Sequence, residues 1–337
     1  MVSIQDVAKA SGVSVATVSR ALAKPEKVTK TTRAKVLRVV AELGYKPNLL
    51  ARNLRSQESR LIVVLVTNIS NPFFSRVIRG IEKVAQELDY SVLLGDTQND
   101  SEVEARYTGL VAAKQADGVI QLSSRLHGLV FDLILKQYPE AAVVNACACL
   151  DTAHCPTVGV DDVGAARAMT EYLLSLGHRQ IAVVSGSSES PHSRDRMFGH
   201  RLALRAAGMP FDESLIISGN MDLKSGAEAA GRILTLANKP TAVFCFNDEM
   251  AIGAIQRFSE AGWSVPGDIS IAGFDDIEFA AYSAPPLTTI AQPANEMGRT
   301  AMEMLYRRMK GDLETPTVTL PTELRIRGST AAPKAGC

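Results

Sequence analysis

The first 45 residues show short amphipathic segments separated by glycines. Within residues 4–22, IQDVAKASGVSVATVSRAL, apolar positions recur at helical spacing on either side of Gly12. Ser3 can cap the first segment, with Asp6 in the acidic position of a capping box, and Ser14 can cap the second. Gly12 supplies the positive φ that a tight turn needs. The pattern predicts two short helices joined by a glycine turn, which is the arrangement of a helix-turn-helix.

A third helix is predicted from about Thr31 to Leu43. Val36, Val40 and Leu43 form its expected inward stripe, and Gly44 ends the pattern. Three short helices can enclose one small apolar core, so residues 1–46 are predicted to form an all-α domain.

Beyond a polar stretch at residues 56–60, apolar runs alternate with amphipathic segments of helical period. This alternation predicts doubly wound parallel sheets, and so many strands favour two lobes rather than one sheet. A chain of 337 residues with 46% apolar content can bury a large core in two or three domains. The predicted strands are Leu61–Thr67, Ser91–Gly95, Gly118–Leu122, Ala141–Asn145, Thr157–Val160, Ile181–Ser185, Leu215–Ser218, Ala242–Asn247 and Ser270–Phe274.

Charge is distributed unevenly along the chain. Residues 1–60 contain 12 Lys and Arg against 4 Asp and Glu, whereas the remainder contains 24 against 32, giving net charges of +8 and −8. A basic helical domain on an acidic body is the electrostatic footprint of a double-stranded DNA-binding protein, although a scaffold that touches no DNA is the alternative. In the DNA interpretation the second helix enters the major groove. Its expected DNA contacts are Ser14, Val15, Ala16, Thr17, Ser19 and Arg20.

Two stretches carry a specific resemblance. VAKASGVSVATVSRAL and TRAKVLRVVAELGYKPNLLARNL resemble the lactose/galactose repressor family of bacterial transcription regulators, and the similarity extends from Ile4 to Gly328. It implies a helix-turn-helix domain at 1–46, a hinge helix and linker at 47–60, and an effector-binding and dimerisation domain at 61–337. In that family the hinge folds when the two subunits of a homodimer meet on operator DNA, and its leucine wedges into the minor groove. The implied hinge contacts are Ala51, Leu54 and Arg55.

The resemblance also implies a two-lobed, periplasmic-binding-protein-like body. Three crossovers between the lobes are expected near Val160, near Thr289–Pro293 and near Thr322–Arg325. The N-lobe would comprise residues 61–160 and 292–322, and the C-lobe mostly residues 161–290.

Polar residues that follow the apolar runs are the candidate ligand site, because ligands of open α/β sheets bind beyond the carboxyl ends of strands. Amides, carboxylates and an arginine suit a hydroxyl-rich small molecule, and aromatic rings can cover a sugar face or a base. Asp161, Asp248 and Asp276 can alternatively be helix N-caps. With the family alignment added, the expected effector contacts are Phe73, Phe74, Asn145, Asp161, Ser190, His192, Arg196, Asn247 and Asp275.

The effector itself is suggested by resemblance alone. ESRLIVVLV, ISNPFFSRVIRGIE, LSSRL and PPLTTIAQP are most similar to the cytidine-responsive branch of the family, which suggests a nucleoside or ribose-like effector, with a hexose or purine as alternatives. The predicted protein is therefore a dimeric, effector-controlled repressor with no cofactor.

Two other function classes fit parts of the sequence. A solute-binding protein would suit the body, but the basic head and the absence of an export signal oppose it, and the chain is expected to remain cytoplasmic and off the membrane. An enzyme would need a site such as the pair Asp161 and Asp275 with a histidine base from His178, His192 or His200, yet no hydrolase or phosphate-binding motif accompanies them. No metal site is expected, because Cys147, Cys149, His154 and Cys155 lack a second spaced pair.

Overall fold

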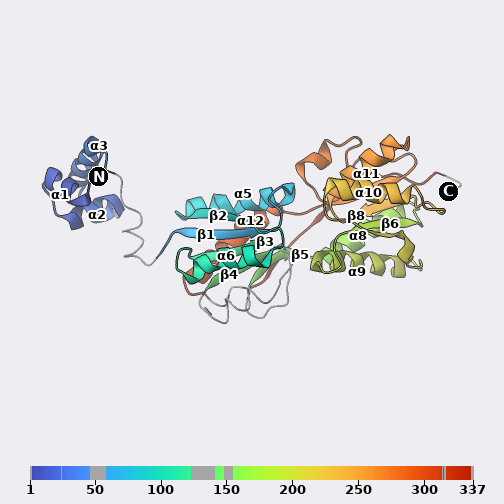
Figure 1. The fold of residues 1–337 in the computed structure, drawn as a ribbon, viewed down its shortest axis with the longest axis horizontal. Helices are drawn as coiled ribbons and strands as arrows, with labels where there is room; N and C mark the ends of the chain where they lie inside the picture. Colours follow the sequence, from blue (N-terminus) through green and yellow to red (C-terminus); the bar gives the residue numbers. More distant parts are fainter. Residues whose placement is uncertain are drawn as a thin grey trace. The chain divides into compact units, whose positions relative to one another are not determined.

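A computed structural model of the chain describes residues 2–23, 25–45, 58–122, 141–147, 155–312, 314 and 316–334. The chain divides into two units, Met1–Ser59 and Arg60–Cys337, which are considered separately (Figure 1). The hinge contacts expected at Ala51, Leu54 and Arg55 lie outside the described residues.

The N-terminal unit contains helices α1 (Ile4–Ser11), α2 (Val15–Ala23) and α3 (Lys30–Leu43), with a 3-10 turn, η1, at Pro25–Lys27. The predicted capping box is present. Ser3 Oγ accepts from the backbone N–H of Asp6 at 3.3 Å, and the Asp6 carboxylate accepts from the backbone N–H of Ser3 at 2.9 Å. Gly12 ends α1 with φ at 62°. The predicted helix-turn-helix is confirmed.

The inward face of α3 differs from the prediction. Val36 and Val39 are buried, Val40 is partly buried, and Leu43 is exposed. Thr29 caps α3 by accepting from the backbone N–H of Thr32, which starts the helix one residue earlier than expected. The core of the unit comprises Val7, Ala8, Val18, Ala21, Val36 and Val39.

The second unit contains two six-stranded sheets, one in each lobe. The first sheet is wholly parallel, in the order β11-β5-β4-β3-β1-β2. On β1, Ile62 and Val64 pack with the core around α5, whereas Val63 and Leu65 pack with the core around α6. Burial of both faces explains why this strand is a continuous apolar run. The lobe contains β1 (Leu61–Val66), α5 (Pro72–Glu87), β2 (Ser91–Asp96), α6 (Ser101–Ala112), β3 (Gly118–Leu122), β4 (Ala142–Ala146), β5 (Thr157–Val160), α12 (Ala294–Met309) and β11 (Val318–Leu320).

The second sheet has the order β12-β10-β9-β8-β6-β7. Figure 1 shows α10 and α11 on one of its faces and α8 and α9 on the other. The sheet is parallel except for β12, which pairs antiparallel with β10 and lies outside the predicted strands. The lobe contains α8 (Asp162–Ser175), β6 (Ile181–Ser185), α9 (Pro191–Ala206), η2 (Glu213–Leu215), β7 (Ile216–Ser218), α10 (Leu223–Ile233), β8 (Ala242–Cys245), α11 (Asp248–Glu260), β9 (Ser270–Asp275), η3 (Glu278–Ala281), β10 (Thr288–Ala291) and β12 (Glu323–Arg325).

The chain passes between the two sheets three times. It leaves the first sheet after β5 and returns after β10, and it crosses once more between β11 and β12. Residues after β12 remain with the second lobe, where Ser329 Oγ donates to the carbonyl oxygen of Ile271 at 2.6 Å. The second lobe therefore extends beyond residue 290 to include β12 and the segment that follows it.

Helices α5 and α12 approach each other closely. A Cβ at Gly298 of α12 would collide with the backbone carbonyl of Val77, and one at Gly80 of α5 would collide with the carbonyl of Asn295. Helices α5 and α12 therefore touch through their backbones at positions where no side chain fits.

Within the described residues, no helix is both long and apolar enough to span a bilayer.

Candidate functional site

A cavity of about 590 Å³ lies between the two lobes of the second unit. It is bordered by segments that follow β1, β2 and β4 of the first lobe and β6, β7 and β8 of the second, so it lies where parallel α/β sheets bind ligands. Its lining comprises Thr67, Asn68, Ser70, Asn71, Phe73, Phe74, Asp96, Gln98, Asn99, Cys147, Ser187, Ser190, His192, Arg196, Gly219, Asn220, Met221, Asn247, Asp275 and Gln292.

Arg196 is the cation of this cavity, and its side chain is held from several directions. Its Nε donates to Asp162 Oδ1 at 2.7 Å, its Nη1 donates to the backbone carbonyl of Phe246, and its Cζ lies 3.6 Å from the ring centroid of Phe274. Only 5% of Arg196 is exposed. A guanidinium fixed in this way offers its remaining N–H groups in a defined direction.

Asp162 orients both Arg196 and His192. Its second oxygen, Oδ2, lies 2.6 Å from Nδ1 of His192. Burial opposes ionisation of Asp162, but the charge of Arg196, followed by His192, outweighs burial and lowers the pKa of this carboxyl to about 2. An ionised carboxylate only accepts hydrogen bonds, so Nδ1 of His192 carries the hydrogen. In the neutral ring Nε2 is then a hydrogen-bond acceptor.

Asp275 is a second buried carboxyl group at the cavity. Its Oδ1 accepts from Gln292 Nε2 at 2.7 Å and lies 3.9 Å from Arg196 Nη1. Burial raises the pKa of Asp275 to about 6, although Arg196 and the Gln292 hydrogen bond act in the opposite direction. The φ of Asp275 is 111°, a conformation that non-glycine residues rarely adopt. Such backbone strain is concentrated at functional sites.

The remaining predicted contacts form the walls of the cavity. Asn247 caps α11, with Oδ1 accepting from the backbone N–H of Met250 at 3.0 Å and Nδ2 donating to the carbonyl of Met221 at 2.9 Å. Phe73 and Phe74 meet edge to face, with ring centroids 5.5 Å apart. Phe73 is buried and Phe74 is partly exposed, so Phe74 offers more accessible apolar surface.

Most of the predicted effector contacts share this cavity. Two of them, Asn145 and Asp161, are not among its lining residues. Asp161 is exposed, and its Oδ1 accepts from the backbone N–H of Gly164 at 2.9 Å, so it is the N-cap of α8. Asn145 is buried within β4. The predicted residues that do line the cavity are Phe73, Phe74, Ser190, His192, Arg196, Asn247 and Asp275.

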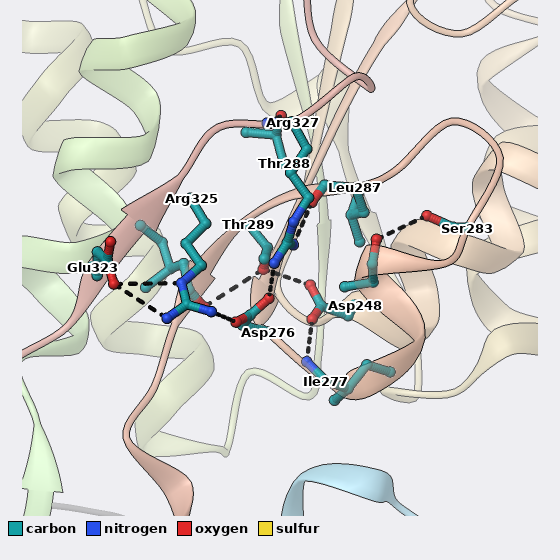
Figure 2. A network of polar contacts seen from close by, with 12 residues as sticks. Asp248, Asp276, Ile277, Ser283, Leu287, Thr288, Thr289, Glu323, Arg325 and Arg327 are labelled. Atoms are coloured by element: carbon teal, nitrogen blue, oxygen red, sulfur yellow. Dashed lines mark hydrogen bonds and ion pairs between the residues drawn. The ribbon is translucent and has the colours of Figure 1, made fainter.

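The N-cap interpretation of Asp248 and Asp276 is wrong. Both belong to a polar network between β9, α11 and the crossover strands, drawn in Figure 2. Asp276 accepts from Arg325 Nη1 at 2.8 Å and from Arg327 Nη2 at 2.6 Å. Asp248 is fully buried and accepts from Thr289 Oγ1 at 2.6 Å. The network connects the residues at the end of β9 to β10 and β12, the two strands next to the crossovers between the lobes.

A direct hydrogen bond connects the lobes beside this network. Nη1 of Arg76, on α5 of the first lobe, donates to the backbone carbonyl of Asp276 at 2.6 Å. The preceding residue, Asp275, lines the cavity. A ligand that contacts Asp275 is therefore one peptide unit away from a contact between the two lobes.

The sequence interpretation missed several residues of the site. Asp162, rather than its neighbour Asp161, holds the cavity arginine, although two adjacent carboxylates at a helix start were a visible signal. Gln292 lies within the predicted second crossover but carried no signal of its own. Cys147 also lines the cavity, and burial, followed by the charges of Asp275 and Asp162, raises the pKa of its thiol far above the ordinary value.

The second helix of the N-terminal unit presents most of the predicted DNA contacts to solvent. Ser14, Val15, Ala16 and Arg20 are exposed, Thr17 and Ser19 are partly exposed, and Val18 between them is buried. Ser14 Oγ accepts from the backbone N–H of Thr17 at 3.1 Å and lies 2.8 Å from Thr17 Oγ1. These two hydroxyls therefore also stabilise the start of α2.

Of the residues considered for an enzyme, only His192 and Asp275 share the interlobe cavity. His178 is buried and lies 2.8 Å from Thr241 Oγ1 and 2.9 Å from the carbonyl oxygen of Ala331. His200 is buried against Thr170 Oγ1, and burial lowers its pKa to about 4. Neither histidine lines the interlobe cavity, and Asp161 does not share that cavity with Asp275. The described residues also contain no group of three or more His, Cys, Asp or Glu arranged to hold a metal ion.

A helix-turn-helix unit followed by a two-lobed α/β body with a polar interlobe cavity defines a class of DNA-binding regulators. Family models agree with this class: residues 3–48 match the lacI family of bacterial regulatory proteins, and residues 170–330 match a periplasmic binding protein-like domain. The HTH-type transcriptional repressor CytR of Escherichia coli K12 is 40% identical to the chain, with 98% of this chain and 96% of the repressor covered.

Solved structures agree with this assignment. The lac repressor dimer, bound to operator and the anti-inducer ONPF, matches with a TM-score of 0.89 and 29% identity, covering 98% of this chain and 99% of that one. A LacI family regulator from Enterococcus faecium with bound ribose matches with a TM-score of 0.73 and 31% identity, covering 81% of this chain and 100% of that one. The chain belongs to the lacI family and is a DNA-binding transcriptional repressor.

Proposed function

We propose that the protein represses transcription as a homodimer on a palindromic operator, and that a nucleoside or ribose-like effector in the interlobe cavity controls its affinity for DNA. The observation that carries this proposal is the cavity itself, in which Arg196, Asp275 and His192 converge from the second lobe opposite Phe73 and Phe74 of the first. Arg196 can donate to ligand oxygens, and Asp275 and His192 can accept from hydroxyl or amino groups. Such an arrangement suits a polyhydroxylated ligand with one flat face.

The choice of effector rests on chemistry that a pentose and a nucleoside share. The E. faecium regulator, solved with bound ribose, supports a ribose-like ligand. Phe74 offers a surface for a base or a sugar face, whereas Met221 on the opposite wall provides no aromatic ring for stacking. A hexose or a purine base is the alternative effector within the same mechanism.

Control of DNA binding would follow from the contact between the lobes beside the cavity. An effector that holds Asp275 alters the position of the Asp276 carbonyl, which accepts the interlobe hydrogen bond from Arg76. The ligand can shift the lobes only by its differential affinity for their two arrangements, and tenfold control requires about 1.4 kcal/mol. In the proposed dimer, the lobe angle would hold or separate the paired hinge segments that contain Ala51, Leu54 and Arg55.

On the DNA side, we propose that α2 reads the major groove in each half-site and that Leu54 enters the minor groove at the centre of the operator. The exposed face formed by Val15, Ala16 and Arg20 supports the first part. Two identical reading heads require two inverted half-sites, so a footprint confined to one asymmetric half-site would contradict the dimer.

The experiment has two stages, both with the full-length protein. A thermal-shift screen of nucleosides, pentoses, hexoses and purines identifies the effector class, because a ligand that binds only the folded state raises the melting temperature. Fluorescence anisotropy with genomic fragments and with random DNA, at one salt concentration, then measures specific binding with and without each hit. If no genomic fragment is preferred over random DNA under any of these conditions, the proposed function is wrong.

A further inference from the structure

A second cavity, of about 560 Å³, lies within the C-terminal lobe. One face of α9, the carboxyl end of β6 and strand β7 line it. It shares no lining residue with the interlobe cavity, although its Gly186 lies directly against Met221, where a Cβ at Gly186 would collide with the Met221 methyl group. The two cavities are neighbours with separate linings.

The lining of this second cavity is positively charged. Arg194 and Arg201 both line it, together with four serines, and no carboxylate is among its lining residues. Both arginines are exposed, and across the described part of the chain neither forms an ion pair with a carboxylate. The chain beyond residue 60 carries a net charge of −8, yet two arginines and no acidic residue line this cavity. Two arginines with no carboxylate beside them in the lining favour an anionic ligand, because guanidinium groups form strong hydrogen bonds to carboxylate and phosphate oxygens.

Arg201 is preorganised for such a contact. Its Cζ lies 4.1 Å from the ring centroid of Phe211, so the guanidinium is held over an aromatic face. An arginine held over a ring keeps the N–H groups at its edge available for hydrogen bonds to carboxylate or phosphate oxygens.

An apolar surface lies between the two arginines. Phe198 follows Arg194 by four residues and precedes Arg201 by three, a spacing that places all three on one face of α9. Phe198 is 54% exposed, and Met197 beside it also lines the cavity. A flat apolar surface flanked by cations matches a ligand that combines an aromatic ring with an acidic group.

The inner wall contains a buried hydroxyl group that lacks a partner. Ser193 lines the cavity and is only 3% exposed, and its Oγ has no hydrogen-bond partner among the described residues. Leaving a buried hydroxyl unpaired is unfavourable, and most such groups in proteins have a partner. A ligand oxygen at the inner end of the cavity would supply one.

We propose that this cavity binds a small aromatic anion, an aryl phosphate or aryl carboxylate, with its acidic group on Arg194 and Arg201 and its ring on Phe198. The site is separate from the interlobe cavity, and the proposal does not depend on the proposed function. Failure of operator binding or of the effector screen would therefore leave this proposal unaffected.

The test is isothermal titration of the full-length protein with phenyl phosphate. Arg194→Gln and Arg201→Gln are each expected to lower its affinity roughly tenfold, equal to about 1.4 kcal/mol, and Phe198→Ala is expected to weaken binding as well. Arg205→Gln is the matched control, because Arg205 is also exposed on α9 but does not line the cavity. Its affinity is expected to remain within about twofold of the wild-type value.

Three further titrations distinguish binding in this cavity from binding elsewhere on the protein. Inorganic phosphate and benzyl alcohol, each lacking one half of the proposed ligand, are expected to bind much more weakly than phenyl phosphate. In the Asp275→Asn variant, which alters only the interlobe cavity, the affinity for phenyl phosphate is expected to be unchanged. The proposal is overturned if Arg205→Gln weakens binding as much as Arg194→Gln, or if Asp275→Asn abolishes binding. It is also overturned if either half-ligand binds as tightly as phenyl phosphate. Absence of saturable binding at about 10 mM phenyl phosphate, a concentration that would detect even millimolar affinity, would overturn it as well.

Discussion

Asp162 Oδ1 and Arg196 Nε lie 2.7 Å apart, and both side chains are almost completely buried. Asp162 sits at the first turn of α8 and Arg196 on α9, so this ion pair joins two helices on one face of the second sheet. It also sets the direction of the guanidinium that lines the interlobe cavity. Arg196 is thus as much a structural residue as a candidate ligand contact, and a variant that removes it would not test ligand binding alone.

Asp162→Asn is expected to destabilise the protein strongly. Removing one partner of a buried ion pair typically costs roughly 3–5 kcal/mol. Because Asp275 Oδ1 still lies 3.9 Å from Arg196 Nη1, the loss is expected toward the lower end of that range. Urea or thermal unfolding of the full-length protein measures the change.

The matched control is Glu171→Gln on the same helix. Arg167 Nε lies 2.7 Å from Glu171 Oε1, the same distance as in the buried pair, but about half of each side chain is exposed. Exposed pairs contribute roughly 0–1 kcal/mol, so this variant is expected to change little. Equal losses in both variants would mean that burial of the Asp162 pair has no special role.

Asp275→Asn is expected to weaken effector binding while leaving the fold intact. Asparagine tolerates the positive φ at this position and can still accept from Gln292, but it loses the charge that favours ligand hydroxyls. Loss of such a hydrogen bond costs roughly 1–3 kcal/mol, or about 5- to 150-fold in affinity. Calorimetry with the effector from the screen measures this loss, and operator affinity without effector is expected to remain unchanged.

Asp161→Asn is the control for that variant, because Asp161 is an exposed N-cap and asparagine caps helices equally well. A pH series adds a second criterion. With the pKa of Asp275 at about 6, the carboxylate becomes protonated as pH falls below 6, so the wild-type affinity is expected to decrease there. The same decrease in Asp275→Asn would show that another group is responsible.

Glu249→Gln is expected to stabilise the protein at high pH and to have little effect at low pH. Burial, followed by the charges of Asp275 and Asp222, raises the pKa of Glu249 to about 7 from an ordinary value of 4.5. Between these values the folded protein keeps a proton that the unfolded chain has released. The contribution of Glu249 to stability is therefore fully present below pH 4.5 and is lost as pH rises through 7.

Melting temperatures at pH 5 and pH 8 measure this difference. The variant is expected to melt above the wild type at pH 8 and close to it at pH 5, because glutamine resembles the protonated carboxyl group in shape. Glu260→Gln, at an exposed position of the same helix, serves as the control. A pH-independent effect of Glu249→Gln would contradict the raised pKa.

The fold could be predicted from periodicity because each lobe buries both faces of its sheet. Strand β1, LIVVLV, is apolar throughout for this reason, and capping by Ser3 with a turn at Gly12 is a purely local signal. Prediction failed where tertiary packing decides. Leu43 lies within the apolar stripe of α3 but is exposed at the last residue of the helix, whereas Val36 and Val39 contribute to the core. No local feature of residues 323–325 indicates an antiparallel pairing with β10.

The segments that contribute to the candidate site could be predicted from the sequence, but not every residue within them. Strand ends identify the segments that face the cavity, because this depends only on the direction of parallel strands. Adjacent polar residues at such an end point in different directions, and their roles depend on distant partners. Asp162 pairs with Arg196, which lies 34 residues away in the sequence, whereas Asp161 caps a helix. Asp275 and Asp276 also differ in their roles, because Asp275 lines the cavity whereas Asp276 pairs with Arg325 and Arg327.

Arg20→Gln in α2, the helix proposed to read DNA, is expected to weaken binding to operator and random DNA to a similar extent. Arg20 is exposed in the last turn of α2, with a long cationic side chain suited to a phosphate. Loss of one phosphate contact should reduce the slope of log affinity against log salt concentration by about 0.9.

Val15→Ser, on the same exposed face but uncharged, is expected to weaken operator binding without changing that slope, because an apolar contact to a base edge releases no counterion. Arg38→Gln is the charge-matched control, since Arg38 is an exposed residue of α3 that lies 3.7 Å from Glu42. Anisotropy titrations at several salt concentrations distinguish the three variants, and an unchanged slope in Arg20→Gln would remove Arg20 from the DNA interface.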